Sequence, residues 1–199
     1  MCFVVRFPVG ICMVLPEITV ARTPLHKRSV VVEVFERADG LWDLDAELVD
    51  TKSYSFPLSN GGEHPAGQPV HHMLLRITIN SDYTIVDAGV QYDAAPYAVC
   101  DTIVQSYQKL IGLNLIRGFR HEVRARLAGK HGCTHMTELT NVLPTAAIQG
   151  VAARLNRFNS GQKQQTRPFH IDGCHALRAD GEVVREFYPK WYEKPETAQ

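Results

Sequence analysis

The chain has 199 residues, and its 21 lysines and arginines balance 21 aspartates and glutamates, so the formal net charge is zero. This balance argues against nucleic acid as a partner, because proteins that bind it need a basic surplus to neutralise phosphates, and against a polybasic membrane anchor. Hydrophobic residues make up 45%, which is ordinary for a folded domain of this length. Nine histidines exceed the usual share and point to site chemistry.

The two ends of the chain are expected to lie outside the fold. Residues 1–25 read as a disordered N-terminal extension, either native or the result of a mis-assigned start. Their apolar core, Val9 to Leu15, is shorter than the roughly 20 residues that cross a bilayer, and no clean signal-peptide cleavage site follows. We expect a single domain over 26–192 and a tail over 193–199. Five cysteines without the spacing of a disulfide scaffold favour reduced thiols and a cytoplasmic protein.

The first half of the domain has the pattern of strands. Residues 26–35 are rich in β-branched side chains, and residues 41–51 alternate strictly between apolar and acidic ones, which predicts two strands with one apolar face. A long loop rich in proline and glycine covers 53–70, and such loops are often functional. Strands over 73–79 and 83–92 complete an expected antiparallel meander of about four strands.

The second half changes to helical spacing. Apolar residues recur at helical intervals over 97–110, a short basic helix is expected over 118–127, and a longer helical pattern over 134–158 is kinked or interrupted at a proline. The segment 180–188 opens with Asp-Gly and continues with β-branched residues, which predicts a final hairpin. We therefore predict an α+β fold, in which an antiparallel sheet with a C-terminal hairpin packs against two or three helices.

A cysteine and a histidine flank one residue at an expected helix start. The positive end of a helix favours the thiolate of Cys133, and Glu138 lies three residues beyond His135, so both can face the same side of the first turn. The competing interpretation is structural, with Thr134 or Thr137 capping the helix and Glu138 completing a capping box.

Cysteines also begin the preceding helical segment and occur near the C-terminus. Thiolates and imidazoles are the usual ligands of tetrahedral zinc, so Cys100, Cys133, His135 and Cys174 form an alternative metal-ligand set, with His175 adjacent. No Cys-x-x-Cys pair supports this set, and small buried cysteines are the structural alternative.

Further candidates flank the long loop on both sides. Asp50, Lys52 and Tyr54 close the second strand, where an acid, a base and a phenol can hold a polar ligand or move a proton, or form only a surface ion pair. His71 and His72 enter the third strand, and alternation places their rings on opposite faces. At most one of them can therefore serve a given pocket, where imidazole suits general acid–base work.

Several separated motifs occur together in this chain: the run Arg37–Leu44 with Asp50–Lys52, Val70–Met73 leading to Arg76, Ala95–Tyr97 before Cys100, Gly132–His135, and Cys174–Leu177 with Tyr188–Pro189. As a set they resemble a bacterial family catalogued as domain of unknown function 2889, over roughly residues 26–192. The resemblance implies little about activity beyond a loose association with bacteria that degrade aromatic compounds, including lignin-derived ones. The order of strand, cysteine and Cys-x-His is also similar to iron–sulfur scaffold proteins of the NifU type, although the ligand spacing and the Cys-His near the C-terminus depart from that pattern.

These observations lead us to predict an enzyme, a lyase without an organic cofactor that cleaves a lignin-derived or similar phenolic compound in aromatic catabolism. The catalytic candidates are His71, Lys52, Asp50, His135, Cys133 and His175, and the substrate-binding candidates are Tyr54, Tyr97, Arg76 and Glu138. Proton transfer by His71, His135 or Lys52 would start the cleavage, with the substrate phenol as electron sink.

Two other classes of function stay open at this point. One is a metal-binding protein, related to zinc or iron–sulfur chemistry, or a zinc hydrolase, using the cysteine and histidine set above. The other is a non-enzymatic protein that binds a small molecule or assists another protein. The expected partners are a small aromatic substrate and a second copy in a homo-dimer or higher homo-oligomer, without nucleic acid or membrane.

Overall fold

The structure is a computed structural model, and it describes residues 15–152, 154–155 and 166–195. Contacts group the described residues up to Leu155 into a main unit and those of 166–195 into a C-terminal unit. Residues 15–25 form neither helix nor strand and are exposed, while the rest of the expected N-terminal extension lies outside the described residues. The expectation of a single domain over 26–192 stays a prediction.

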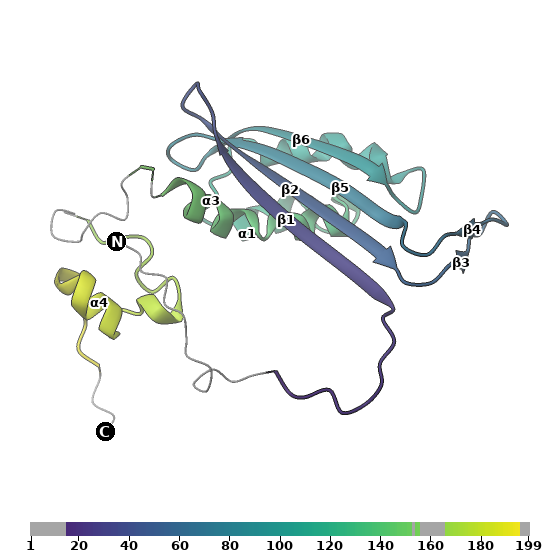
Figure 1. Ribbon diagram of the computed structural model, residues 1–199. Helices are drawn as coiled ribbons and strands as arrows, with labels where there is room; N and C mark the ends of the chain where they lie inside the picture. Colours follow the sequence, from purple (N-terminus) through teal and green to yellow (C-terminus); the bar gives the residue numbers. More distant parts are fainter. Residues whose placement is uncertain (1–14, 153, 156–165, 196–199) are drawn as a thin grey trace. The chain divides into compact units, whose positions relative to one another are not determined.

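Four long antiparallel strands form the sheet of the main unit (Figure 1). The strands run in the spatial order β1 (His26–Glu36), β2 (Trp42–Lys52), β5 (Pro69–Ile79) and β6 (Ile85–Ala94). Neighbours in space are also consecutive long strands in the chain, so the predicted meander is confirmed. The loop between β2 and β5 folds into a small hairpin of β3 (Phe56–Pro57) and β4 (Glu63–His64).

Strict alternation gives the sheet one buried face. Along β2 the apolar residues Trp42, Leu44, Ala46 and Leu48 are buried, whereas the acidic residues between them are partly exposed. Helices cover the buried face (Figure 1) and join its side chains in one core. The predicted α+β class is therefore confirmed.

The covering layer consists of short helices. These are η1 (Cys100–Leu110), α1 (Phe119–Leu127), η2 (Gly129–His131), α2 (Thr134–Thr140) and α3 (Leu143–Val151). The expected interruption at Pro144 is a true break, because Pro144 stands in the first turn of α3, where its missing N–H has no partner to lose. No described helix combines the length and the apolar composition that crossing a bilayer requires.

The C-terminal unit corrects the predicted final hairpin. It contains η3 (His175–Leu177), α4 (Glu182–Phe187) and η4 (Pro189–Trp191), and no described residue of this unit is in a strand. In α4 the amides of Arg185 and Tyr188 donate to the carbonyls four residues earlier, at 3.0 and 2.9 Å. The strand prediction for this stretch is wrong because a short apolar run does not distinguish a strand from a short helix. Here one buried side chain, Val184, packs against Ile171 and Ala179 and holds the helix in place.

Candidate functional site

A row of polar side chains crosses three strands at one end of the sheet. Arg28 on β1 pairs in register with Asp50 on β2, and Asp50 pairs with His71 on β5. Asp50 follows the buried Leu48 by two residues, which places it on the same face. His71 precedes the buried Met73 by two residues and faces the same way. The row therefore lies on the helix-covered face, where Asp50 is only 1% exposed.

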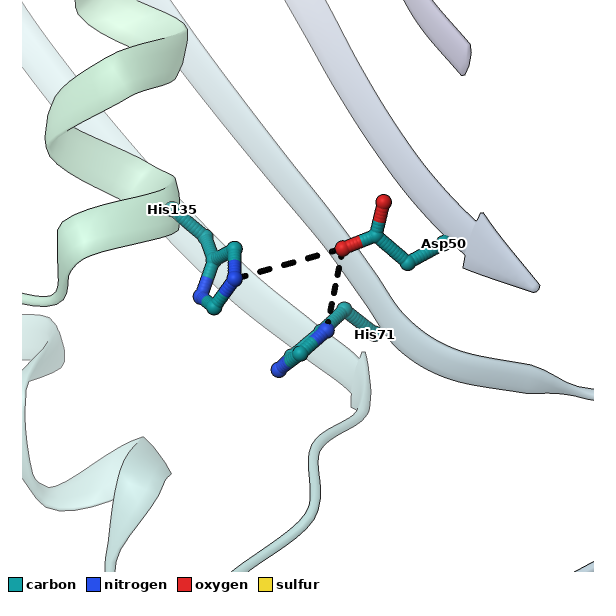
Figure 2. Close-up of side chains that lie close together, drawn as sticks. All are labelled: Asp50, His71 and His135. Carbon is teal, nitrogen blue, oxygen red and sulfur yellow. Dashed lines mark hydrogen bonds and ion pairs between the residues drawn. The ribbon is translucent and has the colours of Figure 1, made fainter. Parts of the chain in front are cut away.

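Helix α2 brings a fourth polar side chain, His135, to this row. His135 stands in its first turn, and its Nε2 lies 4.0 Å from Oδ2 of Asp50. The rings of His135 and His71 stack with their centroids 3.9 Å apart and an angle of 33° between their planes. Figure 2 shows both imidazoles directing a nitrogen toward the same carboxylate oxygen.

The carboxylate of Asp50 has a partner on every side. Arg28 binds it through two nitrogens, with Nε donating to Oδ1 and Nη2 donating to Oδ2, both at 2.8 Å. Nδ1 of His71 lies 3.0 Å from Oδ2, and Nε2 of His26 lies 3.2 Å from Oδ1. Two parallel, charge-assisted bonds from one guanidinium fix the plane of the carboxylate, so Asp50 is a rigid anchor for the groups around it.

Burial and charge set the protonation of the central pair. Burial by itself would raise the pKa of Asp50, but the hydrogen bonds and the charge of Arg28 outweigh it and hold that pKa below its usual value. Burial, followed by the neighbouring His135, lowers the pKa of His71, and the attraction of Asp50 offsets this only in part. Near neutral pH the site therefore holds an ionised Asp50 and a neutral His71.

Glu138 closes the outer side of the row. It accepts a hydrogen bond from Nη1, the remaining nitrogen of the Arg28 guanidinium, although its side chain is 55% exposed. The capping-box alternative is not what the structure shows, because no side chain caps the start of α2 at Cys133. Glu138 also lines a shallow cavity of about 280 Å³ together with Thr134 and Thr137.

Cys133 is held mainly through its backbone. Its amide donates to the hydroxyl of Tyr107 at 2.9 Å, and that hydroxyl lies 3.0 Å from both the carbonyl of Cys133 and the hydroxyl of Thr137. Burial raises the pKa of Tyr92 far above its usual value, and the neighbouring Cys133 adds to the rise. The backbone contacts of Cys133 with Tyr107 fix the start of α2.

Two other candidates beside the long loop lie next to each other. Nζ of Lys52 lies 3.4 Å from the hydroxyl of Tyr54 and stands over the rings of Tyr54 and Phe56. Neither residue contacts Asp50 or His71 by a hydrogen bond or ion pair within the described part of the chain. Their assignment to catalysis and to substrate binding stays a prediction.

Alternation separates two more residues from the row. Arg76 lies on the opposite face of the sheet, where it binds Asp45 through two nitrogens at 2.6 and 2.5 Å, so it does not join the row. His72 also lies on that face and contacts Glu47 at 2.7 Å. The expectation that His71 and His72 point apart is confirmed, and His71 is the one that serves the site.

The remaining candidates lie elsewhere. Tyr97 precedes η1 and is 69% exposed, and Cys100 is the half-buried first residue of that helix. Cys174 and His175 belong to the C-terminal unit, where Cys174 is exposed and Nε2 of His175 lies 3.3 Å from NH1 of Arg178.

Only one group of three metal-binding side chains converges among the described residues. The ligand atoms of Asp50, His71 and His135 all lie within 4.8 Å of one another. Cys100 and Cys133 do not take part in such a group. The structure thus points to a ligand set that shares only His135 with the one expected from the sequence.

Two of the residues that contact Asp50 are not among the candidates expected from the sequence. Arg28 and His26 stand on β1 at alternating positions that continue the partly buried Val32 and Val34. A signal for Arg28 was present, because an arginine in the inward phase of a strand needs an acidic partner. The hairpin register supplies that partner as Asp50.

Comparison with known proteins confirms the resemblance seen in the motifs. Residues 26–149 match the family described as "Protein of unknown function (DUF2889)". The matched range begins with β1 and ends within α3, so it contains the whole Asp50 row and His135 but not the C-terminal unit. Neither a curated protein nor a solved structure matches the chain.

Proposed function

We propose that this chain, which belongs to the DUF2889 family, is an enzyme that works by proton transfer at the site of Asp50, His71 and His135. The observation that carries the proposal is the contact of 3.0 Å between Nδ1 of His71 and the buried carboxylate of Asp50. An ionised carboxylate only accepts hydrogen bonds, so Nδ1 must carry the proton of the neutral ring. The lone pair then lies on Nε2, which is the arrangement of a general base.

The surroundings of His71 support this role. Nε2 of His71 has no hydrogen-bond partner among the described residues, so it is free to accept a proton from a substrate. The imidazolium that forms is stabilised by Asp50, while the stacked His135 cannot become charged at the same time without repulsion. The two rings therefore suit the passage of a single proton, which His71 accepts as the base and then releases as the acid.

Arg28 and Asp50 act as positioning residues in this proposal. The two bonds of Arg28 keep Asp50 ionised and planar, and Asp50 in turn fixes the orientation and tautomer of His71. Glu138 holds Arg28 from the other side. None of these three needs to exchange a proton with the substrate.

The same contacts favour acid–base chemistry over covalent catalysis. Within the described part of the chain, no hydroxyl or thiol is hydrogen bonded to His71 or His135, whereas an activated nucleophile needs such a base. In the proposed step His71 removes a proton from the substrate, and the electron pair of that bond forms a new π bond as a C–C or C–O bond breaks. The leaving fragment then takes the proton from the imidazolium. This is a lyase reaction, and the phenolic, lignin-type substrate rests on the motif resemblance.

Glutamine in place of His71 tests the function. With purified protein and a panel of phenolic, lignin-type dimers, we expect His71→Gln to lower turnover by about 100-fold or more, since positioned acid–base groups contribute roughly 10²–10⁴-fold. His72→Gln is the matched control, because it changes the adjacent residue on the opposite face. NMR of the imidazole nitrogens identifies the tautomer of His71 without any substrate. We expect it to show the proton on Nδ1. Equal turnover of His71→Gln and wild type, or a proton on Nε2, overturns the proposal.

A further inference from the structure

We infer that Asp50, His71 and His135 also form a binding site for one divalent transition-metal ion, of which zinc fits best. This goes beyond the proposed function, because proton transfer by His71 requires no metal. The inference starts from the three donor atoms, a carboxylate oxygen and two imidazole nitrogens that lie within 4.8 Å of one another.

The separations between the carboxylate oxygen and each of the two nitrogens are close to those around a tetrahedral ion. Bonds of about 2.0–2.2 Å in tetrahedral geometry place neighbouring donors about 3.4 Å apart. Oδ2 of Asp50 lies 3.0 Å from Nδ1 of His71 and 4.0 Å from Nε2 of His135. Both separations differ from the tetrahedral value by no more than about 0.6 Å, which a small rotation of the rings supplies. Figure 2 shows the two nitrogens converging on the oxygen.

Three different elements hold the ligands in place. Asp50 and His71 are cross-strand partners, so the sheet register fixes their separation. His135 comes from the first turn of α2, which covers the same face. Ligands that are held on strands and a helix, instead of on loops, lose little freedom when an ion binds.

The net charge around the donor atoms also favours the binding of a cation. With neutral imidazoles, the charges of Asp50 and Glu138 exceed that of Arg28 by one negative unit. Each carboxylate oxygen has two lone pairs, so Oδ2 can bind a metal while it still accepts the bond from Arg28. Arg28 and His26 then orient the ligating carboxylate, as hydrogen-bonding neighbours do at metal sites.

The donor types select the class of ion. Imidazole suits zinc and the neighbouring transition metals, whereas magnesium and calcium prefer sites built from oxygen. Three protein ligands leave a fourth tetrahedral position for water or a substrate atom, which is the pattern of catalytic zinc sites. An ion bound at Nδ1 of His71 needs the lone pair of that atom, so the proton of the neutral ring must then sit on Nε2, and zinc should inhibit proton transfer by this histidine.

Metal titration of the full chain tests the inference. Protein freed of metal by a chelator is titrated with cobalt(II), followed by its visible absorption, and with zinc, followed by calorimetry. We expect one ion per chain, with affinity lowered at least tenfold in His71→Gln and in His135→Gln. His72→Gln and Cys133→Ser are the controls and should bind like wild type, since neither side chain belongs to the ligand set. Magnesium and calcium should give no signal.

The outcomes separate this inference from the proposed function. Absence of binding to wild type, or equal binding by His71→Gln and His135→Gln, overturns the metal site. Circular dichroism confirms folding, and thermal unfolding gives a second measure, because zinc should raise the Tm of wild type but not of His135→Gln. If the metal site fails while His71→Gln still abolishes turnover, the proposed function stands. If zinc binds but turnover does not depend on His71, the metal site stands and the proposed function fails.

Discussion

Asp50 and His71 face each other across the β2–β5 pair, with Oδ2 and Nδ1 3.0 Å apart, on the face of the sheet that the helices cover. The carboxylate is buried and is compensated by Arg28 on the neighbouring strand. An unpaired charge in this position would be costly. The stability of the fold and the chemistry of the site therefore depend on the same residues.

Asparagine in place of Asp50 should destabilise the fold. It keeps the shape of the side chain but removes the charge, and it leaves the guanidinium of Arg28 without its carboxylate. Breaking a buried ion pair typically costs about 3–5 kcal/mol, and because Arg28 is one-third exposed we expect about 2–4 kcal/mol. Denaturant unfolding measures this, with Asp45→Asn as the control on the exposed face. A loss below about 0.5 kcal/mol for Asp50→Asn would contradict the pairing.

The pH dependence of stability follows from the directions of two pKa shifts. The pKa of His71 is lowered in the fold, so its contribution is complete above the ordinary histidine value of about 6.5 and is lost as the pH falls. The pKa of Asp50 is also lowered, so its contribution is complete above about 3.9 and is lost below that value. The free energy of unfolding should therefore decline on acidification in two stages.

Variants assign the two stages. Denaturant unfolding at a series of pH values should show that His71→Gln flattens the decline between about pH 7 and 5, whereas Asp50→Asn flattens the decline below about pH 4. His72→Gln serves as the control for the first stage. Identical profiles for His71→Gln and wild type would show that His71 is not held neutral by the fold.

The alternation of apolar and polar residues alone predicts the strands of the sheet, and it predicts the faces on which Asp50 and His71 lie. The apolar positions of β2 continue in phase to Asp50, and the opposite orientations of His71 and His72 follow from a period of two. The buried phase of β5, Met73 and Leu75, continues to His71 and favours it over His72, whereas its cross-strand partner depends on the register, which no single strand reveals. The sequence therefore nominates both His71 and Asp50, but not the contact between them.

The other half of the site depends on tertiary packing. His135 reaches Asp50 only because α2 docks over the β2–β5 pair, and no local pattern states where a helix will dock. Arg28 lies 22 residues before Asp50 in the chain and meets it through the hairpin. The Cys-x-His motif directed attention to Cys133, whose contacts instead secure the helix start. Residues that are close in the sequence, such as Cys133 and His135, therefore do not show which side chains meet at the site.

Arg76 offers a check on which face of the sheet carries function. It was a candidate for substrate binding, but it lies on the opposite face, paired with Asp45. Arg76→Gln should leave turnover and metal binding within about twofold of wild type, and should cost less than about 1 kcal/mol, because exposed ion pairs contribute little. A tenfold loss of turnover would place function on the open face of the sheet instead.

Gly150 tests how closely α3 packs on β1. A Cβ built at this position would lie 2.6 Å from Cγ1 of Val34, which is closer than real contacts allow. Gly150→Ala would gain up to about 1 kcal/mol in helix propensity, but crowding in a packed interface costs about 1–3 kcal/mol. We expect a net loss of stability in denaturant unfolding.

A second substitution decides whether crowding is the cause. In the background of Val34→Gly, all three side-chain carbons that Gly150→Ala would meet are gone, so the added methyl should be neutral or stabilising there. The double-mutant cycle should therefore show a favourable coupling of about 1 kcal/mol or more between the two changes. Equal losses from Gly150→Ala in both backgrounds would mean that Val34 does not set the distance between α3 and β1.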